Sequence, residues 1–212
     1  MFYQKEKEQY LRLGDILRGF IISNPKIKEP IHKHTQAYSY NINIDIPEFT
    51  VVLTPCCSIR TKTLLLTSLI ELDKSFFLNP YLVEDFTRIN RIIEPQNRYP
   101  PEEWKQLSDE KKTEELIKGK QYILFHYFVY KETDYFQIYT KKEHQTRYYI
   151  IDFRKIFSIN CTDLKIKKSG KIPDNIFNAK ILQLSVNTRN DLRNKLVNYF
   201  GRIPDEDKLQ LD

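Results

Sequence analysis

Short stretches in the first 72 residues either alternate polar and apolar positions or are apolar throughout. Residues 38–46 alternate, which is typical of a half-buried β-strand. Residues 49–53 and 64–72 are almost wholly apolar, as in strands that are buried on both faces. With a further candidate at 13–22, the pattern predicts four strands and no full-length helix among them. Such an arrangement indicates a small barrel or a strongly curled sheet.

The middle of the chain changes to helical spacing. Apolar side chains recur at that spacing within residues 83–94, and a charged stretch at 101–117, closed by Gly119, predicts another helix. Strand patterns then return, and we expect a three-stranded meander at 122–130, 135–140 and 147–153.

A final helix is expected to begin near Asn187, a residue type suited to the N-cap, and to end at Gly201. Its apolar side chains are expected to face inward: Leu192, Leu196, Val197 and Phe200. The whole pattern predicts an α+β fold, mainly β, that closes with a C-terminal helix.

Composition narrows the class of protein. Hydrophobic residues make up 41% of the 212 positions, enough to bury a core. The formal net charge of +6 permits binding to nucleic acid or to an acidic protein and requires neither. A charged N-terminus and no apolar run of about 18 residues predict a cytoplasmic protein with reduced thiols and no membrane segment. Two glycine-rich motifs that bind phosphate groups, G-x-x-x-x-G-K and G-x-G-x-x-G, do not occur in the sequence, and no cofactor is expected.

Three segments carry a family resemblance when they are taken in order. Residues 14–17 are Gly-Asp-Ile-Leu, residues 49–53 form an apolar run followed by Leu-Leu-Leu-Thr-Ser at 64–68, and residues 150–159 lead into Cys-Thr-Asp-Leu at 161–164. They are similar to the opening of the first strand, the central strand pair and the late strand of the MazF/PemK family of toxin endoribonucleases.

The resemblance covers residues 11–72 and 147–200. It implies a single domain over residues 1–212, with 73–146 as an insertion into the family's core. The implied fold is a small SH3-like β-barrel with inserted helices and strands, often assembled as a homodimer.

Catalysis in the family requires an arginine just ahead of the central strand and a threonine at the end of the next. Thr67 falls at the threonine position, but Glu48 stands where the arginine should be. The arginine stabilises the charge that develops on phosphate, and a carboxylate repels it. The resemblance therefore implies that ribonuclease activity has been lost, unless Arg18 or Arg60 takes the missing role.

Other chemistry is only weakly indicated. Cys56 and Cys57 follow a predicted strand and His32 and His34 precede it, but adjacent cysteines are a poor zinc chelate, so no metal site is expected. Basic residues near aromatic ones form a candidate surface for nucleic acid or for a partner. These are Lys141, Lys142, Arg147, Lys165, Lys167 and Lys168.

The first hypothesis is a catalytically degenerate MazF-like protein that regulates by binding another protein. The partner would be an antitoxin or transcription regulator encoded nearby, in a bacterial toxin–antitoxin, antiviral defence or stress-signalling system, and proteolysis within the charged segment 95–119 is one route to its release. One alternative is an active sequence-specific endoribonuclease that uses Thr67 with Arg18 or Arg60. Another is a nucleic-acid-binding domain without catalysis, with RNA as its partner.

Overall fold

The computed structural model describes residues 1–20, 22–26, 41–55, 63–78, 80–122, 124–134, 136, 148–160 and 179–201. The chain divides into two compact units. We call Glu6–Ile70 with Ile156–Gln183 the sheet unit. The mixed unit comprises Met1–Lys5, Glu71–Lys155 and Leu184–Asp212. In the described ranges, no helix combines the length and the apolar character needed to cross a membrane.

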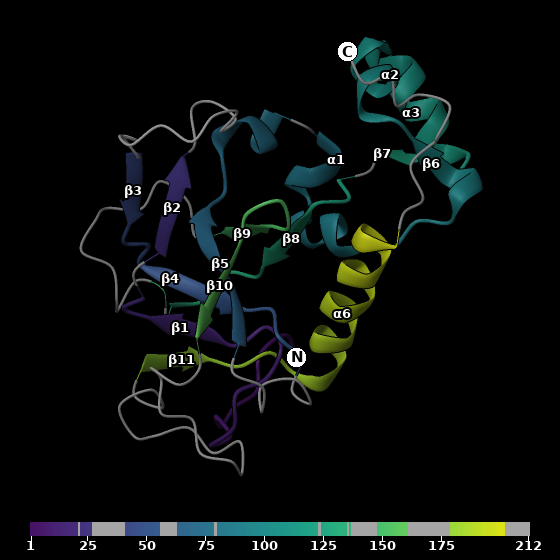
Figure 1. Cartoon of the computed structure of the whole chain (residues 1–212). Coiled ribbons are helices and arrows are strands. Elements are labelled where there is room, and N and C mark those ends of the chain that lie inside the picture. The colour runs from purple at the N-terminus through teal and green to yellow at the C-terminus, as the bar shows by residue number, and fades with distance from the viewer. Residues whose placement is uncertain are drawn as a thin grey trace. The chain divides into compact units, whose positions relative to one another are not determined.

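The sheet unit is built from antiparallel strands, labelled in Figure 1. The hydrogen-bonded order β11-β1-β4-β5 continues to β10, which also pairs with β5. These strands are β1 (Ile16–Arg18), β4 (Phe49–Val52), β5 (Thr63–Glu71), β10 (Ile156–Asn160) and β11 (Lys180–Leu182). A separate antiparallel ribbon pairs β2 (Ile22–Lys26) with β3 (Asn41–Asp45).

The two apolar runs at 49–53 and 64–72 are confirmed as strands β4 and β5. The expected first strand is instead divided into β1 and β2. Gly19 lies between them with φ of 84°, a conformation that side chains with a Cβ rarely adopt, so the chain turns there.

One face of the sheet forms an apolar core. Its buried members are Leu11, Leu17, Val52, Leu64 and Leu66, with Phe20 and Ile159 packed against them. The register explains the grouping, because Val52 pairs with Leu66 and Leu64 pairs with Ile159, and directly paired residues share a face.

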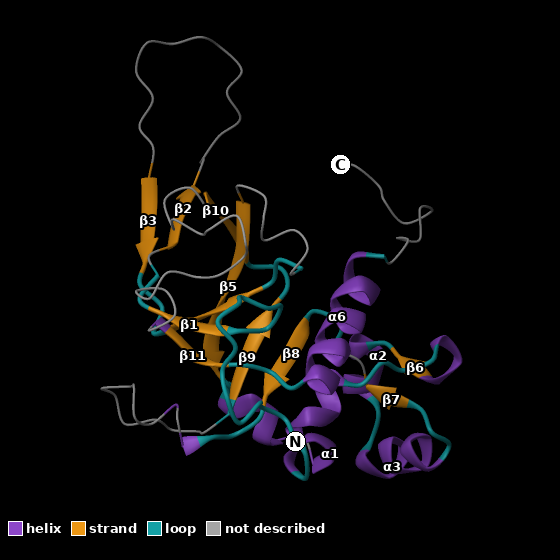
Figure 2. Ribbon diagram, turned by 90° about the horizontal axis from the view of Figure 1, so that it is seen from below, coloured by secondary structure: helices purple, strands orange, loops and turns teal. Residues whose placement is uncertain are grey.

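The mixed unit holds the helices and two small strand pairs, drawn by type in Figure 2. Strands β8 (Tyr127–Tyr130) and β9 (Tyr149–Asp152) are antiparallel, and β6 (Arg98–Tyr99) is parallel to β7 (Gln121–Tyr122). The helices are η1 (Lys74–Leu78), α1 (Pro80–Val83), η2 (Phe86–Asn90), η3 (Pro95–Asn97), α2 (Pro101–Gln106), α3 (Asp109–Ile117) and α6 (Val186–Phe200).

Local capping divides two of the predicted helices. At 83–94, the Asp85 carboxylate accepts a hydrogen bond from the Thr87 backbone N–H at 3.0 Å and starts the 3₁₀ helix η2. At 101–117, the Ser108 hydroxyl accepts from the Lys111 N–H and starts α3. A polar side chain inside a helical pattern therefore began a new helix in both places.

The predicted meander is only partly observed. The segment 122–130 begins at the last residue of β7, turns at Phe125 and His126 and ends with β8, and β9 lies within the third predicted strand. Most of 135–140 lies outside the described residues.

The C-terminal helix is confirmed, but its start and its buried face differ from the prediction. Ser185, not Asn187, is the N-cap, and its hydroxyl accepts from the Thr188 N–H at 3.3 Å. Val197 and Phe200 are 66% and 62% exposed, so they do not face inward. The fold as a whole is mixed α+β with mainly antiparallel strands, in agreement with the predicted class.

Candidate functional site

Thr67, the candidate catalytic threonine, lies inside the sheet. It pairs with Val51 of β4 and with Ile156 of β10. It is 1% exposed, and Val51, which shares its face, is fully buried. A bound RNA chain cannot contact this hydroxyl unless the strands around it move.

Arg18 and Glu48 lie at the other end of β4. Arg18 is the exposed last residue of β1 and pairs with Phe49, and Glu48 precedes Phe49 and is exposed as well. Arg18 and Thr67 flank β4 on opposite sides, two residues apart along the strand. Ordinary strand spacings then put their Cα atoms about 12 Å apart. Because one side chain faces solvent and the other is buried, the two do not form an open catalytic pair.

The remaining predicted site residues fall outside the described part of the chain. They are Arg60, Lys141, Lys142, Arg147, Lys165, Lys167 and Lys168, together with His32, His34, Cys56 and Cys57. Among the residues that are described, no cluster of three or more histidine, cysteine or acidic side chains is placed to hold a metal ion.

An exposed patch, not predicted from the sequence, lies at the end of the ribbon formed by β2 and β3, whose backbone is drawn in Figure 2. Ile44 and Ile46 are 65% and 72% exposed, and Asp45 and Glu48 are exposed beside them. We call these four residues the ribbon surface. The alternation at 38–46 predicts a half-buried strand, yet the apolar side chains at its end face solvent. The alternation shows that Ile44 and Ile46 share a face, but it does not show whether another element covers that face.

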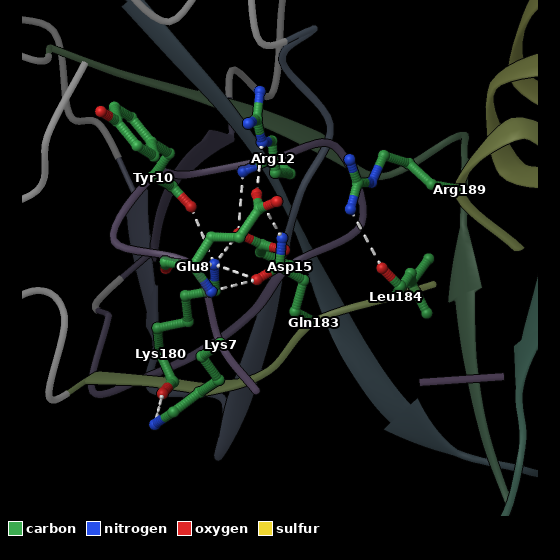
Figure 3. A network of polar contacts seen from close by, with 9 residues as sticks. All are labelled: Lys7, Glu8, Tyr10, Arg12, Asp15, Lys180, Gln183, Leu184 and Arg189. Carbon is green, nitrogen blue, oxygen red and sulfur yellow. Dashed lines mark hydrogen bonds and ion pairs between the residues drawn. The ribbon is translucent and has the colours of Figure 1, made fainter. Parts of the chain in front are cut away.

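A buried ion pair joins the start of β1 to β11 within the sheet unit (Figure 3). The Lys180 ammonium lies 2.7 Å from the Asp15 carboxylate, and both side chains are fully buried. The ammonium also donates to the backbone carbonyls of Tyr10 at 2.8 Å and Glu8 at 3.1 Å, and to the Gln183 side-chain oxygen at 2.9 Å. These bonds offset the cost of removing the charges from water.

The same network explains the Gly-Asp-Ile segment structurally. Asp15 accepts from the Arg12 backbone N–H at 2.8 Å, and Gly14, with φ of 84°, donates its N–H to the Val52 carbonyl at 2.7 Å. The aspartate thus holds the turn that leads into β1. Since it is wholly buried, its role in this arrangement is to position the strand and not to contact a substrate.

Asp152, in the third segment of the family resemblance, also has a structural partner. Its carboxylate forms a two-point pair with the Arg154 guanidinium, at 2.9 Å to Nε and 2.7 Å to Nη2. Burial raises the pKa of Asp152, but the hydrogen bonds from Arg154 outweigh that effect and hold the pKa below its usual range. The pair fixes the turn between β9 and β10 and leaves Asp152 ionised at neutral pH.

The burial of Lys195, in α6, was also not predicted from the sequence. It is 5% exposed, and burial lowers the pKa of its amine to about 7. It follows the buried Leu192 by three positions, a spacing that places both on one helix face. That spacing was visible in the sequence, but a lysine is normally assigned to the solvent side.

Comparison with known proteins does not assign the chain to a family. No protein-family profile matches the chain, and no curated protein matches it at a significant level.

Proposed function

We propose that this chain has a divergent MazF/PemK-like SH3-like barrel, does not cleave RNA, and acts by binding another protein. The proposal is supported chiefly by the burial and the charge of the residues at the two positions that the family uses for catalysis. Thr67 is buried in the sheet, and Glu48, which stands at the arginine position, is exposed.

The loss of catalysis follows from electrostatics. One donor that stabilises a developing oxyanion typically contributes about 2.7–4 kcal/mol to lowering the barrier. Glu48 supplies a negative charge where that donor is needed, and Asp45 is exposed three residues earlier. Two carboxylates so close together repel the phosphate backbone of RNA, although the chain as a whole is positively charged.

Protein binding is supported by the ribbon surface. Two isoleucines that are mostly exposed, rimmed by carboxylates, are typical of a contact region for another protein. Among the strands that the structure describes, β3 pairs with β2 alone, and we propose that an extended segment of the partner adds to the other edge of β3. The complementary partner is a segment with apolar side chains and lysine or arginine beside them.

An antitoxin or transcription regulator encoded next to this chain is the partner that we propose. The setting would be a bacterial toxin–antitoxin, antiviral defence or stress-signalling system in the cytoplasm. Proteolysis between residues 95 and 119 is the proposed route of release, because α3 in that segment is exposed over most of its residues. A homodimer formed through the same surface is the competing occupant.

Co-purification with the products of adjacent genes tests the binding. The tagged chain should retain one of these proteins, and Ile44→Lys with Ile46→Lys should release it. Ile117→Lys is the matched control, because Ile117 is an exposed isoleucine of the mixed unit. The proposal fails if no neighbouring gene product binds, or if the double variant binds as well as the wild type. A wild-type dimer that dissociates in the double variant would assign the surface to self-association.

Incubation with a long, lightly structured RNA tests the absence of cleavage. We expect intact RNA with the wild type and with Thr67→Ala. Discrete cuts that disappear in Thr67→Ala would establish the endoribonuclease instead and direct attention to Arg18 or Arg60. Tight RNA binding without cuts, weakening steeply with added salt, would support the nucleic-acid-binding alternative.

A further inference from the structure

The mixed unit contains a small cavity between α6 and the segment that follows η2. Its volume is about 20 Å³, room for about one water-sized group. It is lined by Arg91, Ile92, Ile93, Arg98, Phe125, Lys195 and Asn198. None of these described lining residues is acidic, while three of them carry basic groups.

Lys195 forms the buried part of this lining. The side chain is 5% exposed, and no hydrogen bond or ion pair from the described residues reaches its ammonium. Burying an ammonium without a partner costs free energy, and desolvation accordingly lowers the pKa of Lys195. An anion in the cavity would supply the missing partner.

Two arginines line the same cavity as Lys195. Arg98 donates its Nε–H to the Ile93 carbonyl at 2.8 Å, and its guanidinium lies 5.4 Å from the centre of the Phe125 ring. That bond orients the side chain without using its terminal amino groups. The Arg91 side chain is 56% exposed and lies 3.9 Å from the Asp85 carboxylate, too far for a hydrogen bond.

We propose that Lys195, Arg98 and Arg91 bind a phosphate group, with Asn198 beside it. The lining has three basic groups and no carboxylate, which favours a ligand with two negative charges over a ligand with one. Guanidinium groups also suit phosphate oxygens. The cavity has room for about one phosphate oxygen, so the rest of the phosphate and any ester substituent remain outside it, on the side of the exposed Arg91 and Ile92. The apolar walls formed by Ile93 and Phe125 strengthen the attraction by excluding water. This inference concerns the mixed unit and is independent of the proposed protein binding.

Inorganic phosphate is the probe for the first experiment, with chloride at matched ionic strength as the reference. The full chain, carrying ¹⁵N-labelled lysine, is titrated at about pH 8, where the Lys195 amine is mainly neutral. Phosphate should saturably convert the Lys195 signal to the ammonium form, an effect that a purely structural lysine would not show. Glycerol phosphate gives the second arm: equal affinity indicates recognition of the phosphate group alone, and tighter binding indicates a phosphate monoester as the ligand.

Calorimetry on variants supplies the second measurement. Lys195→Met and Arg98→Gln should each weaken phosphate binding by about ten- to a hundredfold, since each removes a charged hydrogen-bond donor. Arg193→Gln removes an exposed charge from the same helix and should bind as the wild type does. The proposal is overturned if phosphate shifts no Lys195 signal, or if Arg98→Gln retains full affinity. Neither the Lys195 signal of the wild type nor the affinity of Arg98→Gln depends on Lys195→Met, so both can be measured even if that variant fails to fold.

Discussion

The free energy of unfolding should depend on pH through Lys195, and the substitution Lys195→Met should remove that dependence. Burial lowers the pKa of this amine from its ordinary 10.5 to about 7. Between those values the unfolded chain binds one proton more than the folded chain. Stability therefore rises as the pH increases through this window and falls as it decreases toward 7.

The magnitude follows from the same two values. Each pH unit inside the window changes the free energy by about 1.4 kcal/mol, and the full difference between the two pKa values corresponds to about 5 kcal/mol. Arg91 and Arg98 are the other charged groups that line the cavity with Lys195. Lys195→Met should therefore be more stable than the wild type near pH 7.

Urea denaturation between about pH 7.5 and 9, in a buffer without phosphate, measures the effect. The difference between wild type and Lys195→Met should change by about 2 kcal/mol over that range, and other titrating groups cancel in the difference. Arg193→Gln serves as the control and should follow the wild-type curve. Parallel curves for wild type and Lys195→Met would refute the inference that a neutral amine is buried in the folded protein.

Two further predictions concern stability. Lys180→Met should lower the free energy of unfolding by about 3–5 kcal/mol, because it leaves the Asp15 carboxylate buried without its ammonium. The double variant with Asp15→Leu should recover most of that loss in urea denaturation, and additive losses would contradict the pairing. Ser185→Ala should cost about 1 kcal/mol through loss of the helix cap, while Asn187→Ala should leave the unfolding free energy almost unchanged. A larger loss for Asn187→Ala than for Ser185→Ala, measured by thermal unfolding, would place the helix start at Asn187 instead.

Much of the strand content followed from the sequence alone. The runs that became β4 and β5 are apolar at nearly every position, and such runs are stable as strands only when both faces are covered. The existence of the C-terminal helix was also predictable, because apolar side chains recur at helical spacing from Leu192 to Phe200 and Gly201 follows them. Its first residue was not, since Ser185 and Asn187 are both good caps and the choice between them depends on the tertiary position of the chain.

The burial of individual side chains was decided by the tertiary structure. A period of two or of 3.6 shows which residues share a face, but not whether another element covers that face. The alternation at 38–46 therefore predicted a half-buried strand although Ile44 and Ile46 are exposed. Val197 and Phe200 were expected to face inward for the same reason, and they are exposed as well. Lys195 was overlooked because its charge predicts exposure, whereas it is almost wholly buried.

The sequence by itself determined the α+β class of the fold and its strongest strands. It could not predict the pairing of Asp15 with Lys180, because the two residues are distant in the chain and local patterns carry no signal for such a contact. For the same reason it could not place Lys195 beside Arg91 and Arg98. Periodicity and capping act over a few residues and are visible in the sequence, whereas contacts between distant segments exist only once the chain has folded.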